Sequence, residues 1–317
     1  MSLRRIALEL KCAPSTVSSE LKRGTPPRKS NRGRAPGYSA KRGQAEYERR
    51  KSRSHKPHKV DSCGPFVAWV TQQVRVHRWS LDACVGYARL HRLFKETAMV
   101  CAKTLYNELW AGRLPLSLFE VPEALKRKPR KGKRPESKNP KGPSIEERPA
   151  VVDARGELGH WECDTVVGRR NGKEAVVFTL LERVTDHYLA IRIPGKTSEA
   201  VSDVLEALQA QFGDRFCRVF RSITADNGSE FAGLTQAAPA GTKIHFAHPY
   251  CSWERGQNER HNGLLRRYIP KGRSIGDFSP EDVLMFADEL NALPRKRLAY
   301  RTPEALFDAF LDHIYAA

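Results

Sequence analysis

Apolar residues near the start of the chain recur every three or four positions, which predicts two short helices. Ser2 can cap the first helix, and a break follows at residues 11–13. The apolar face of this helix consists of Leu3, Ile6, Ala7 and Leu10. The second helix, residues 14–23, begins with Pro14, which a first helical turn tolerates, and turns Val17 and Leu21 inward.

The outer face of this second helix carries short polar residues first and bases at its end. These residues are Thr16, Ser19, Lys22 and Arg23. The pattern favours a helix-turn-helix whose second helix enters a DNA major groove. Any amphipathic helical hairpin has the same apolar spacing, so this simpler interpretation stays open.

The next hundred residues alternate between basic loops and helical spacing. Residues 24–59 are rich in Pro, Gly, Arg and Lys, and their second half predicts a basic helix that ends before Pro57. Residues 64–118 contain three helical segments, the second opened by Ser80 with Asp82 and the third closed by Gly112. This spacing is typical of a second compact helix-turn-helix and equally of a structural helical spacer.

The pattern changes to short apolar runs rich in β-branched residues after residue 150. Runs at 160–168, 174–184 and 187–193 predict three successive strands of a meander, with a turn signal at 170–172. Later patterns predict a helix at 197–212, a strand at 218–224, a turn at 226–228, a short helix capped by Ser229, and a strand at 243–247. Helical patterns at 252–268, 280–293 and 303–315 close the chain. This order predicts an α/β domain in which helices flank a mixed β-sheet.

The patterns together divide the chain into four segments. We expect a helix-turn-helix segment with a basic tail at 1–50, a second helical segment at 51–125, a basic Pro/Gly-rich linker at 126–149 and the α/β domain at 150–317. A length of 317 residues is sufficient for two or three domains.

Charge is distributed unevenly between the two halves. The formal net charge is +19, but residues 1–150 hold 34 Lys and Arg against 13 Asp and Glu, whereas the remainder holds 21 against 23. A polycationic half needs an anionic partner, and a phosphate backbone is the expected one. An anionic membrane is the competing partner, but the sequence has no long basic amphipathic helix with a Trp, Phe or Leu face.

Several other classes are excluded by what the sequence does not contain. No apolar run approaches the ~20 residues of a membrane span, and the first 15 residues lack the apolar core of a secretory signal. The seven cysteines are scattered and form no C-x-x-C pair, which argues against a structural zinc site. They fit a reduced cytosolic compartment better than a framework of disulfides.

Three acidic residues are notable for their positions. Asp164 lies inside the first predicted strand, where a carboxylate is costly to bury without a cation. Asp226 ends a later strand, where active sites gather in open sheets, and Glu259 lies in the helix that follows. Carboxylates from two strands and a helix can hold divalent cations such as Mg²⁺ for in-line phosphoryl displacement. Each alone has a simpler interpretation: a turn, a solvated helix residue, or an aspartate paired with arginine.

Two neighbouring features belong to the same pattern. Glu162 shares a strand face with Asp164 by two-residue alternation, so it either substitutes for Asp164 as a ligand or supports it. Gly256 and Gly263 flank Glu259 by one helical turn each, at a cost of about 1 kcal/mol each relative to Ala, and would allow close approach of a backbone or ligand.

Three long motifs carry a specific resemblance. His160-Trp161-Glu162-Cys163-Asp164, Thr224-Ala225-Asp226-Asn227-Gly228-Ser229-Glu230-Phe231, and the stretch from Pro249 to Gly272 that contains Trp253-Glu254-Arg255-Gly256-Gln257-Asn258-Glu259 resemble the catalytic core of bacterial insertion-sequence transposases of the IS-thirty family. The separation of 33 positions from Asp226 to Glu259 also matches that family's Asp-Asp-Glu pattern. The resemblance covers most of residues 155–310 and also Ser2–Arg23.

The resemblance implies a ribonuclease-H-like integrase core with Asp164, Asp226 and Glu259 as catalytic residues and ligands of Mg²⁺, with Mn²⁺ as a substitute. It implies a DNA transposase that binds terminal inverted repeats, cuts the element ends and transfers the strands to target DNA, commonly as a homo-oligomer. Candidate DNA contacts in the third motif are Arg255, Asn262, Arg266 and Lys271.

Two alternative functions stay open beside that of an active DNA transposase. One is a catalytically decayed or domesticated transposase that acts as a DNA-binding regulator, since no helix precedes the first helix-turn-helix. The other is a structure-specific nuclease on the same fold. The sequence also departs from the family at Cys163, where Gly is usual, and at Cys251-Ser252, where Ser-Pro is usual.

Overall fold

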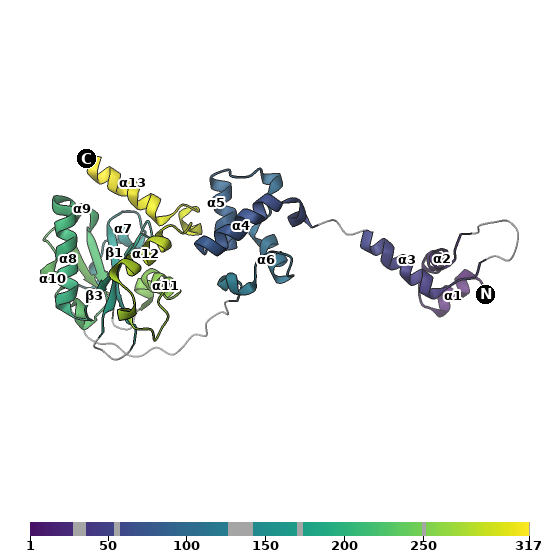
Figure 1. Cartoon of the computed structure of the whole chain (residues 1–317), viewed down its shortest axis with the longest axis horizontal. Coiled ribbons are helices and arrows are strands. Elements are labelled where there is room, and N and C mark those ends of the chain that lie inside the picture. The colour runs from purple at the N-terminus through teal and green to yellow at the C-terminus, as the bar shows by residue number, and fades with distance from the viewer. Residues whose placement is uncertain (28–35, 54–57, 126–141, 170–173, 249–251, 317) are drawn as a thin grey trace. The chain divides into compact units, whose positions relative to one another are not determined.

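A computed structural model describes residues 1–27, 36–53, 58–125, 142–169, 174–248 and 252–316 (Figure 1). Its contacts divide the chain into two compact units, Met1–Ser62 and Cys63–Ala317. Most of the expected linker at 126–149 and the turn signal at 170–172 lie outside the described residues. None of the described helices is both long and apolar enough to cross a membrane.

The described residues of the first unit form three α-helices and a final 3₁₀ turn at Lys59–Ser62. The α-helices are α1 (Leu3–Glu9), α2 (Pro14–Gly24) and α3 (Ala40–Arg53). The hydroxyl of Ser2 accepts a hydrogen bond from the backbone N–H of Arg5 at 3.4 Å, which confirms the expected cap. α2 packs closely on α3, because a Cβ atom at Gly43 would lie only 2.2 Å from Oε1 of Glu20.

The apolar face expected of the first helix is only partly buried. Ala7 is buried, but Leu3 and Leu10 are 41% and 66% exposed. The third helix is too polar to cover them, since Gly43 is the only residue of α3 that is buried. The prediction of four inward-facing residues was therefore wrong for Leu3 and Leu10.

The second unit begins with a helical block, residues 63–125. Its α-helices are α4 (Gly64–His77), α5 (Leu81–Leu90) and α6 (Ala102–Trp110), and short 3₁₀ turns lie at Glu96–Ala98, Leu118–Glu120 and Pro122–Leu125. Ser80 caps α5 by accepting a hydrogen bond from the backbone N–H of Ala83 at 3.1 Å, as expected. Gly112 follows α6 with φ of +68°, a backbone conformation that favours glycine and stops the helix.

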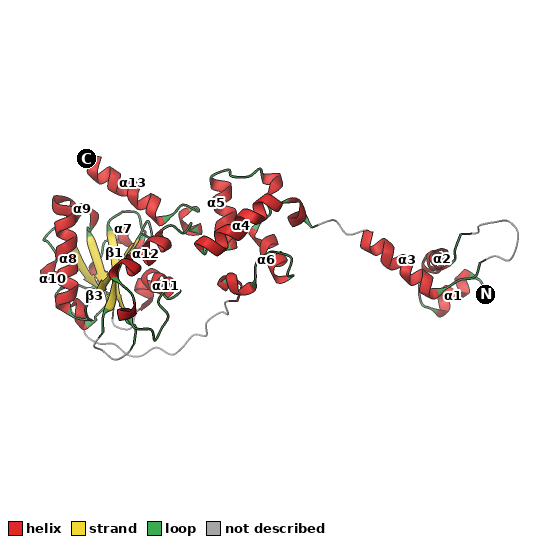
Figure 2. Cartoon of the chain, viewed as in Figure 1, coloured by secondary structure: helices red, strands yellow, loops and turns green. Residues whose placement is uncertain are grey.

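A five-stranded mixed sheet forms the centre of the second unit (Figure 2). Its strands are β1 (His160–Val166), β2 (Val176–Glu182), β3 (Tyr188–Ile193), β4 (Ser222–Ala225) and β5 (Lys243–Phe246). Their order in the sheet is β3-β2-β1-β4-β5. The first three strands pair antiparallel, which confirms the meander, whereas β4 pairs parallel with β1 and β5 parallel with β4.

Helices cover both faces of this sheet. One face shares a core with α8 (Ser198–Phe212), α9 (Phe216–Val219), α10 (Leu234–Ala237) and α13 (Pro303–Ala316). The other face packs against α11 (Gly256–Leu265) and α12 (Pro280–Asn291). Short helical turns complete the unit: α7 (Ala150–Asp153) and the 3₁₀ turns Ile145–Glu147, Gly213–Arg215, Ser229–Phe231, Ser252–Arg255, Ile275–Asp277 and Lys296–Leu298.

The alternation of side chains along β1 determines which residues face α11. Trp161 and Cys163 point into the core shared with α8 and α13, whereas Val166 belongs to the core shared with α11 and α12. Glu162 and Asp164 therefore share the α11 face with Val166. This is the face on which the candidate site lies.

Three predicted elements differ from the observed ones. The strand expected at 218–224 is only Ser222–Ala225, because Phe216, Val219 and Phe220 have helical spacing and bury one face of α9. Ser229 does not cap the short helix, since Gly228 is its cap residue and no side-chain hydrogen bond forms there. The helix expected at 252–268 is a 3₁₀ turn followed by α11, which ends at Leu265.

Candidate active site

The register of the central strands places Asp164 and Asp226 side by side. β1 and β4 pair in parallel, with His160 opposite Ser222 and Glu162 opposite Thr224. The same offset continued by two residues sets Asp164 opposite Asp226, just beyond the last residue of β4. Adjacent strands lie about 4.8 Å apart, so both carboxylates project from neighbouring strand ends on the same edge.

Arg255 bridges these two aspartates. Its Nη2 lies 3.1 Å from Oδ2 of Asp226, and its Nη1 lies 3.9 Å from Oδ2 of Asp164. The guanidinium is buried, and its Nη1 also donates a hydrogen bond to the carbonyl oxygen of Cys163 at 2.8 Å. The pairing of an aspartate with an arginine, the simpler interpretation of Asp164, is thus present, but the same arginine holds both acids together.

The partly buried position of Asp164 makes its charged form less favourable. Burial raises the pKa of the Asp164 carboxyl, the Arg255 guanidinium opposes that rise, and the negative charge of Asp226 adds to it. Its oxygens accept hydrogen bonds from the backbone N–H of Thr165 at 2.8 Å and from Nδ2 of Asn262 at 2.9 Å. A bound cation would relieve the repulsion between the two aspartates.

α11 carries Glu259 and packs on β1 through two asparagines. Asn258 donates a hydrogen bond from Nδ2 to the carbonyl oxygen of Glu162 at 3.3 Å, and Asn262 contacts Asp164. Glu259 lies in the first turn of α11, four residues after Arg255 and three before Asn262, and its side chain is exposed. Among the described residues, no three His, Cys, Asp or Glu side chains are grouped closely enough to hold a metal ion.

Glu162 has structural partners of its own. Its carboxylate forms a buried ion pair with Arg183 and accepts a hydrogen bond from the backbone N–H of Asn258 at 3.3 Å. Burial raises the pKa of Glu162, and Arg183 counteracts that rise. These contacts favour the supporting role over the ligand role, because the carboxylate fastens α11 to β1.

Sequence reasoning missed a further buried carboxylate, that of Glu230. This residue is 1% exposed, and its Oε1 accepts a hydrogen bond from the Thr165 hydroxyl at 2.8 Å and lies 3.1 Å from Nζ of Lys196. Its Oε2 is buried without a hydrogen-bond partner in the described part of the chain. A Cβ atom at Gly228 would lie 2.4 Å from that Oε2 and 2.8 Å from Oδ1 of Asp226, so the two carboxylates approach each other across Gly228.

A signal for Glu230 was present in the sequence. It lies four residues after Asp226 in Asp226-Asn227-Gly228-Ser229-Glu230-Phe231 and directly before a fully buried phenylalanine. An acidic residue next to a core aromatic residue in a tight turn is expensive to bury without a specific partner.

The candidate DNA contacts fall into two groups. On α2, Thr16, Ser19 and Lys22 are exposed, whereas Arg23 is paired with Glu20 at 2.5 Å and lies over the ring of Tyr47. In the second unit, Lys271 is exposed, but three others are turned inward. These are Arg255 and Asn262 on the aspartates, and Arg266, which donates to the carbonyl oxygen of Val167 at 2.7 Å.

The glycines on α11 have open space beside them. Within the described residues, a Cβ atom at Gly256 or Gly263 would meet no other atom within 4 Å, so no described backbone packs against them. Gly256 is the first residue of α11, and Gly263 lies on the side of the helix that lines a cavity, so close approach of a ligand stays a prediction.

The residues present suit a hard divalent cation. Asp164 and Asp226 offer adjacent carboxylate oxygens, the ligand type that Mg²⁺ prefers, and a small number of such ligands is sufficient because Mg²⁺ keeps several waters. The position of the Arg255 guanidinium between them shows that the site attracts positive charge.

A family model and several known proteins resemble this chain. Residues 154–251 match the integrase core domain. The chain is 34% identical over 244 residues to a probable transposase for the insertion-like sequence element IS1161 of Streptococcus salivarius, covering 77% of this chain and 68% of that protein. It is 30% identical to the transposase InsI for the insertion sequence element IS30A of Escherichia coli, covering 97% of this chain and 79% of that protein.

Two more comparisons complete these findings. The transposase for the insertion sequence element IS4351 of Bacteroides fragilis is 30% identical, and the match covers 98% of this chain and 91% of that protein. A solved structure of the catalytic core domain of BIV integrase is 18% identical with a TM-score of 0.37, covering 50% of this chain and 98% of that one.

The core and its relatives define the class of this protein as a DNA transposase with an integrase core, a mixed sheet flanked by helices. The chain belongs to the IS30 (IS-thirty) family of insertion-sequence transposases. The expected fold class and family are thereby confirmed.

Proposed function

We propose that this transposase binds the terminal inverted repeats of an insertion sequence and both cuts and joins DNA strands at one site. The observation that carries the proposal is the register of β1 and β4, which sets Asp164 and Asp226 side by side. The exposed positions Thr16, Ser19 and Lys22 on α2 support recognition of the repeats in a major groove. Two ends must be joined, so we infer that the protein acts on bacterial DNA as a homo-oligomer.

The catalytic residues are Asp164, Asp226 and Glu259, with distinct positions. The two aspartates are fixed by their strands, by Asn262 and by Arg255. Glu259 lies in the first turn of α11 with its side chain exposed, and would have to turn toward the aspartates to act as the third ligand. Bound Mg²⁺ would activate the attacking oxygen and stabilise the leaving one. Arg255 would have to give up part of its contact with the aspartates when that charge arrives.

A strand-transfer assay with labelled DNA tests this function. The substrate carries an element end, and the products of cutting and of joining are separated on a gel in the presence of Mg²⁺. The wild-type protein should give both products. Asp226→Asn and Glu259→Gln should each lower both by roughly 10³-fold, because a metal ligand stabilises transition-state charge by several kcal/mol. Binding of the same DNA in EDTA should stay within about two-fold.

The outcomes of this assay discriminate among the candidate functions. Cutting without joining would indicate a nuclease. Binding without any product in Mg²⁺ or Mn²⁺ would indicate a DNA-binding regulator. Unchanged products in Glu259→Gln would remove Glu259 from the mechanism. Glu206→Gln on the exposed side of α8 is the matched control and should leave both products unchanged.

A further inference from the structure

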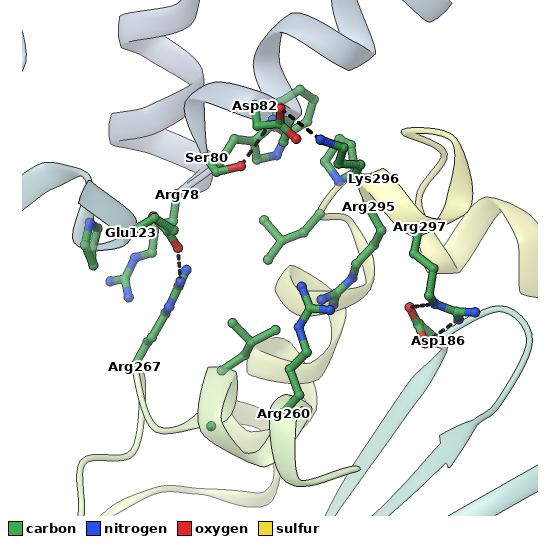
Figure 3. Close-up of a pocket in the computed structure, with 17 residues that line it drawn as sticks. Arg78, Ser80, Asp82, Glu123, Asp186, Arg260, Arg267, Arg295, Lys296 and Arg297 are labelled. Atoms are coloured by element: carbon green, nitrogen blue, oxygen red, sulfur yellow. Dashed lines mark hydrogen bonds and ion pairs between the residues drawn. The ribbon is translucent and has the colours of Figure 1, made fainter. Parts of the chain in front are cut away.

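A cavity of about 890 Å³ lies between the helical block and the side of α11 that faces away from the aspartates (Figure 3). Its walls come from the start of α5, from Pro122 and Glu123, from α11, and from the segment 293–297. The block and the α/β domain contact each other beside it, because the hydroxyl of Tyr300 donates a hydrogen bond to Asp82 at 3.2 Å.

Cationic side chains predominate in this cavity. They are Arg78, Arg260, Arg267, Arg295, Lys296 and Arg297. The lining also contains the three carboxylates of Asp82, Glu123 and Asp186. Six cations against three anions leave a surplus of three positive charges around one cavity, and an anion that enters would relieve the repulsion between them.

Each of the three carboxylates already has a basic partner. Arg267 forms an ion pair with Glu123, Nη2 of Arg297 lies 2.6 Å from Oδ1 of Asp186, and Nζ of Lys296 lies 3.8 Å from Oδ1 of Asp82. Within the described ranges, Arg78, Arg260 and Arg295 therefore have no carboxylate partner. Arg78 lies over the ring of Tyr268 at 4.8 Å, which leaves Arg260 and Arg295 as the unneutralised pair.

These two arginines face each other. Figure 3 shows Arg260 of α11 and Arg295 of the segment after α12 pointing toward one another across the cavity. Arg295 is buried, and its Nε has no partner in the described part of the chain, although its Nη2 donates a hydrogen bond to the carbonyl oxygen of Leu290 at 2.8 Å. Burial lowers the pKa of Arg295 to about 10, Asp186 opposes this, and the like charge of Arg260 adds to it.

The position of the cavity indicates which anion enters. α11 presents Asn258 and Asn262 to β1 on one side and Arg260 to the cavity on the other, and Arg267 lines the cavity just after the helix ends. A helix is about 10 Å wide, so DNA held at Asp164 and Asp226 would pass within about that distance of the arginines. Guanidinium groups bind phosphate oxygens through two parallel hydrogen bonds, which suits a pair of opposed arginines.

We propose that this cavity binds a phosphodiester group of the DNA substrate between Arg260 and Arg295. The proposal rests on the transposase function for its ligand but not on the catalytic residues, because binding requires neither metal nor cutting. Free inorganic phosphate has the same chemistry, so the experiment includes it as a separate ligand.

The test measures DNA binding in EDTA by the full chain and by variants at exposed arginines. Arg260→Gln should weaken the binding of a duplex oligonucleotide by roughly ten-fold and reduce the slope of log affinity against log salt by about one. Arg260→Lys should recover most of the affinity. Arg301→Gln removes the same charge at an exposed position outside the cavity lining and should leave affinity and slope unchanged.

Thermal unfolding without DNA is a second measurement, in which Arg260→Gln should raise the Tm although it weakens DNA binding. Removing one of two opposed charges should raise the Tm of Arg260→Gln by roughly 2 °C, whereas loss of a merely structural contact would lower it. The variant should therefore be more stable and bind DNA more weakly, and this combination also verifies that it folds.

Three results would overturn the proposal. Equal weakening by Arg260→Gln and Arg301→Gln would indicate general charge attraction, and unchanged affinity in Arg260→Gln would remove the cavity from DNA binding. Stabilisation by inorganic phosphate that depends on Arg260, without any change in DNA affinity, would assign the cavity to a free anion. Because all of these measurements are made in EDTA, failure of the catalytic proposal would leave them interpretable.

Discussion

The two units of this transposase differ in whether their charged side chains are exposed or buried. Met1–Ser62 holds 17 Lys and Arg against 5 Asp and Glu in 62 residues, and none of its described charged residues is buried. The second unit buries charged side chains beside charged partners: Glu162 pairs with the buried Arg183, and the buried Arg255 contacts the half-buried Asp226.

This difference follows from what each unit can enclose. Three short helices with few buried residues cannot repay the cost of removing a charge from water, so their charge stays on the surface and is available to phosphates. A sheet covered on both faces has enough packing to hold carboxylates where they repel one another. DNA affinity thus requires only exposed charge, whereas phosphoryl transfer requires charge held in place.

We expect the largest effect from salt, which should weaken DNA binding mainly through the exposed charges of the first unit. Raising salt from 50 to 200 mM should lower DNA affinity in EDTA by roughly 10⁴-fold, because cations released from the phosphates dominate binding. Lys22→Gln on α2 should reduce the salt slope by about one. The matched variant Lys243→Gln, also exposed but on β5, should leave the slope unchanged. Fluorescence anisotropy measures both, and equal slopes for the two variants would abolish the distinction between the units.

A fall in pH should lower the free energy of unfolding through buried histidines of the second unit. His261 of α11 is buried, and burial lowers its pKa from 6.5 to about 4, with Arg295 contributing in the same direction. The folded state keeps this imidazole neutral, so the stabilisation is complete above pH 6.5 and is lost as pH falls toward 4. This lowering of the His261 pKa corresponds to roughly 3 kcal/mol in the free energy of unfolding.

Urea unfolding between pH 7 and 4 measures that loss. His261→Gln should flatten the pH dependence of the unfolding free energy by most of this amount, whereas His313→Gln, at an exposed position on α13, should not change it. His187, whose pKa burial also lowers to about 4, should preserve part of the dependence. An unaltered dependence in His261→Gln would show that the buried imidazole is not the sensitive group.

Local pattern predicted those parts of the fold whose cause is local. The meander follows from alternation in β1, β2 and β3, and the caps at Ser2 and Ser80 follow from residue type. The strand predicted at 218–224 begins too early because the apolar run at the end of α9 is compatible with both structures, and burial of one helical face against α8 decides between them.

The candidate site could be predicted from the sequence only in part, because some of its contacts are not local. Asp164 and Asp226 stand out because they end or interrupt strands, and their adjacency follows from strand pairing. Arg255 was assigned to DNA because a base in a polar helix is usually exposed, whereas in the structure it faces inward to the aspartates. That orientation depends on where α11 packs on β1, a tertiary contact that no spacing along the sequence contains.

Glu230 offers the finest test of whether the second unit depends on charge held in place. Its carboxylate links the turn after Asp226 to Thr165, the residue that follows Asp164, and to Lys196. Glu230→Gln retains an oxygen for the Thr165 hydroxyl but removes the charge. We expect cutting to fall by roughly ten-fold and the Mg²⁺ concentration for half-maximal cutting to rise, because groups that orient ligands contribute about 10–100-fold.

The control for this variant is a glutamate without such contacts. Glu206→Gln on α8 is exposed and should cut DNA at the wild-type rate with the wild-type Mg²⁺ requirement. A merely structural role for Glu230 would lower the folded fraction and leave the Mg²⁺ midpoint of the remaining protein unchanged. A shifted midpoint with normal thermal unfolding instead identifies Glu230 as a positioning residue, since the charge then acts on the aspartates rather than on the fold.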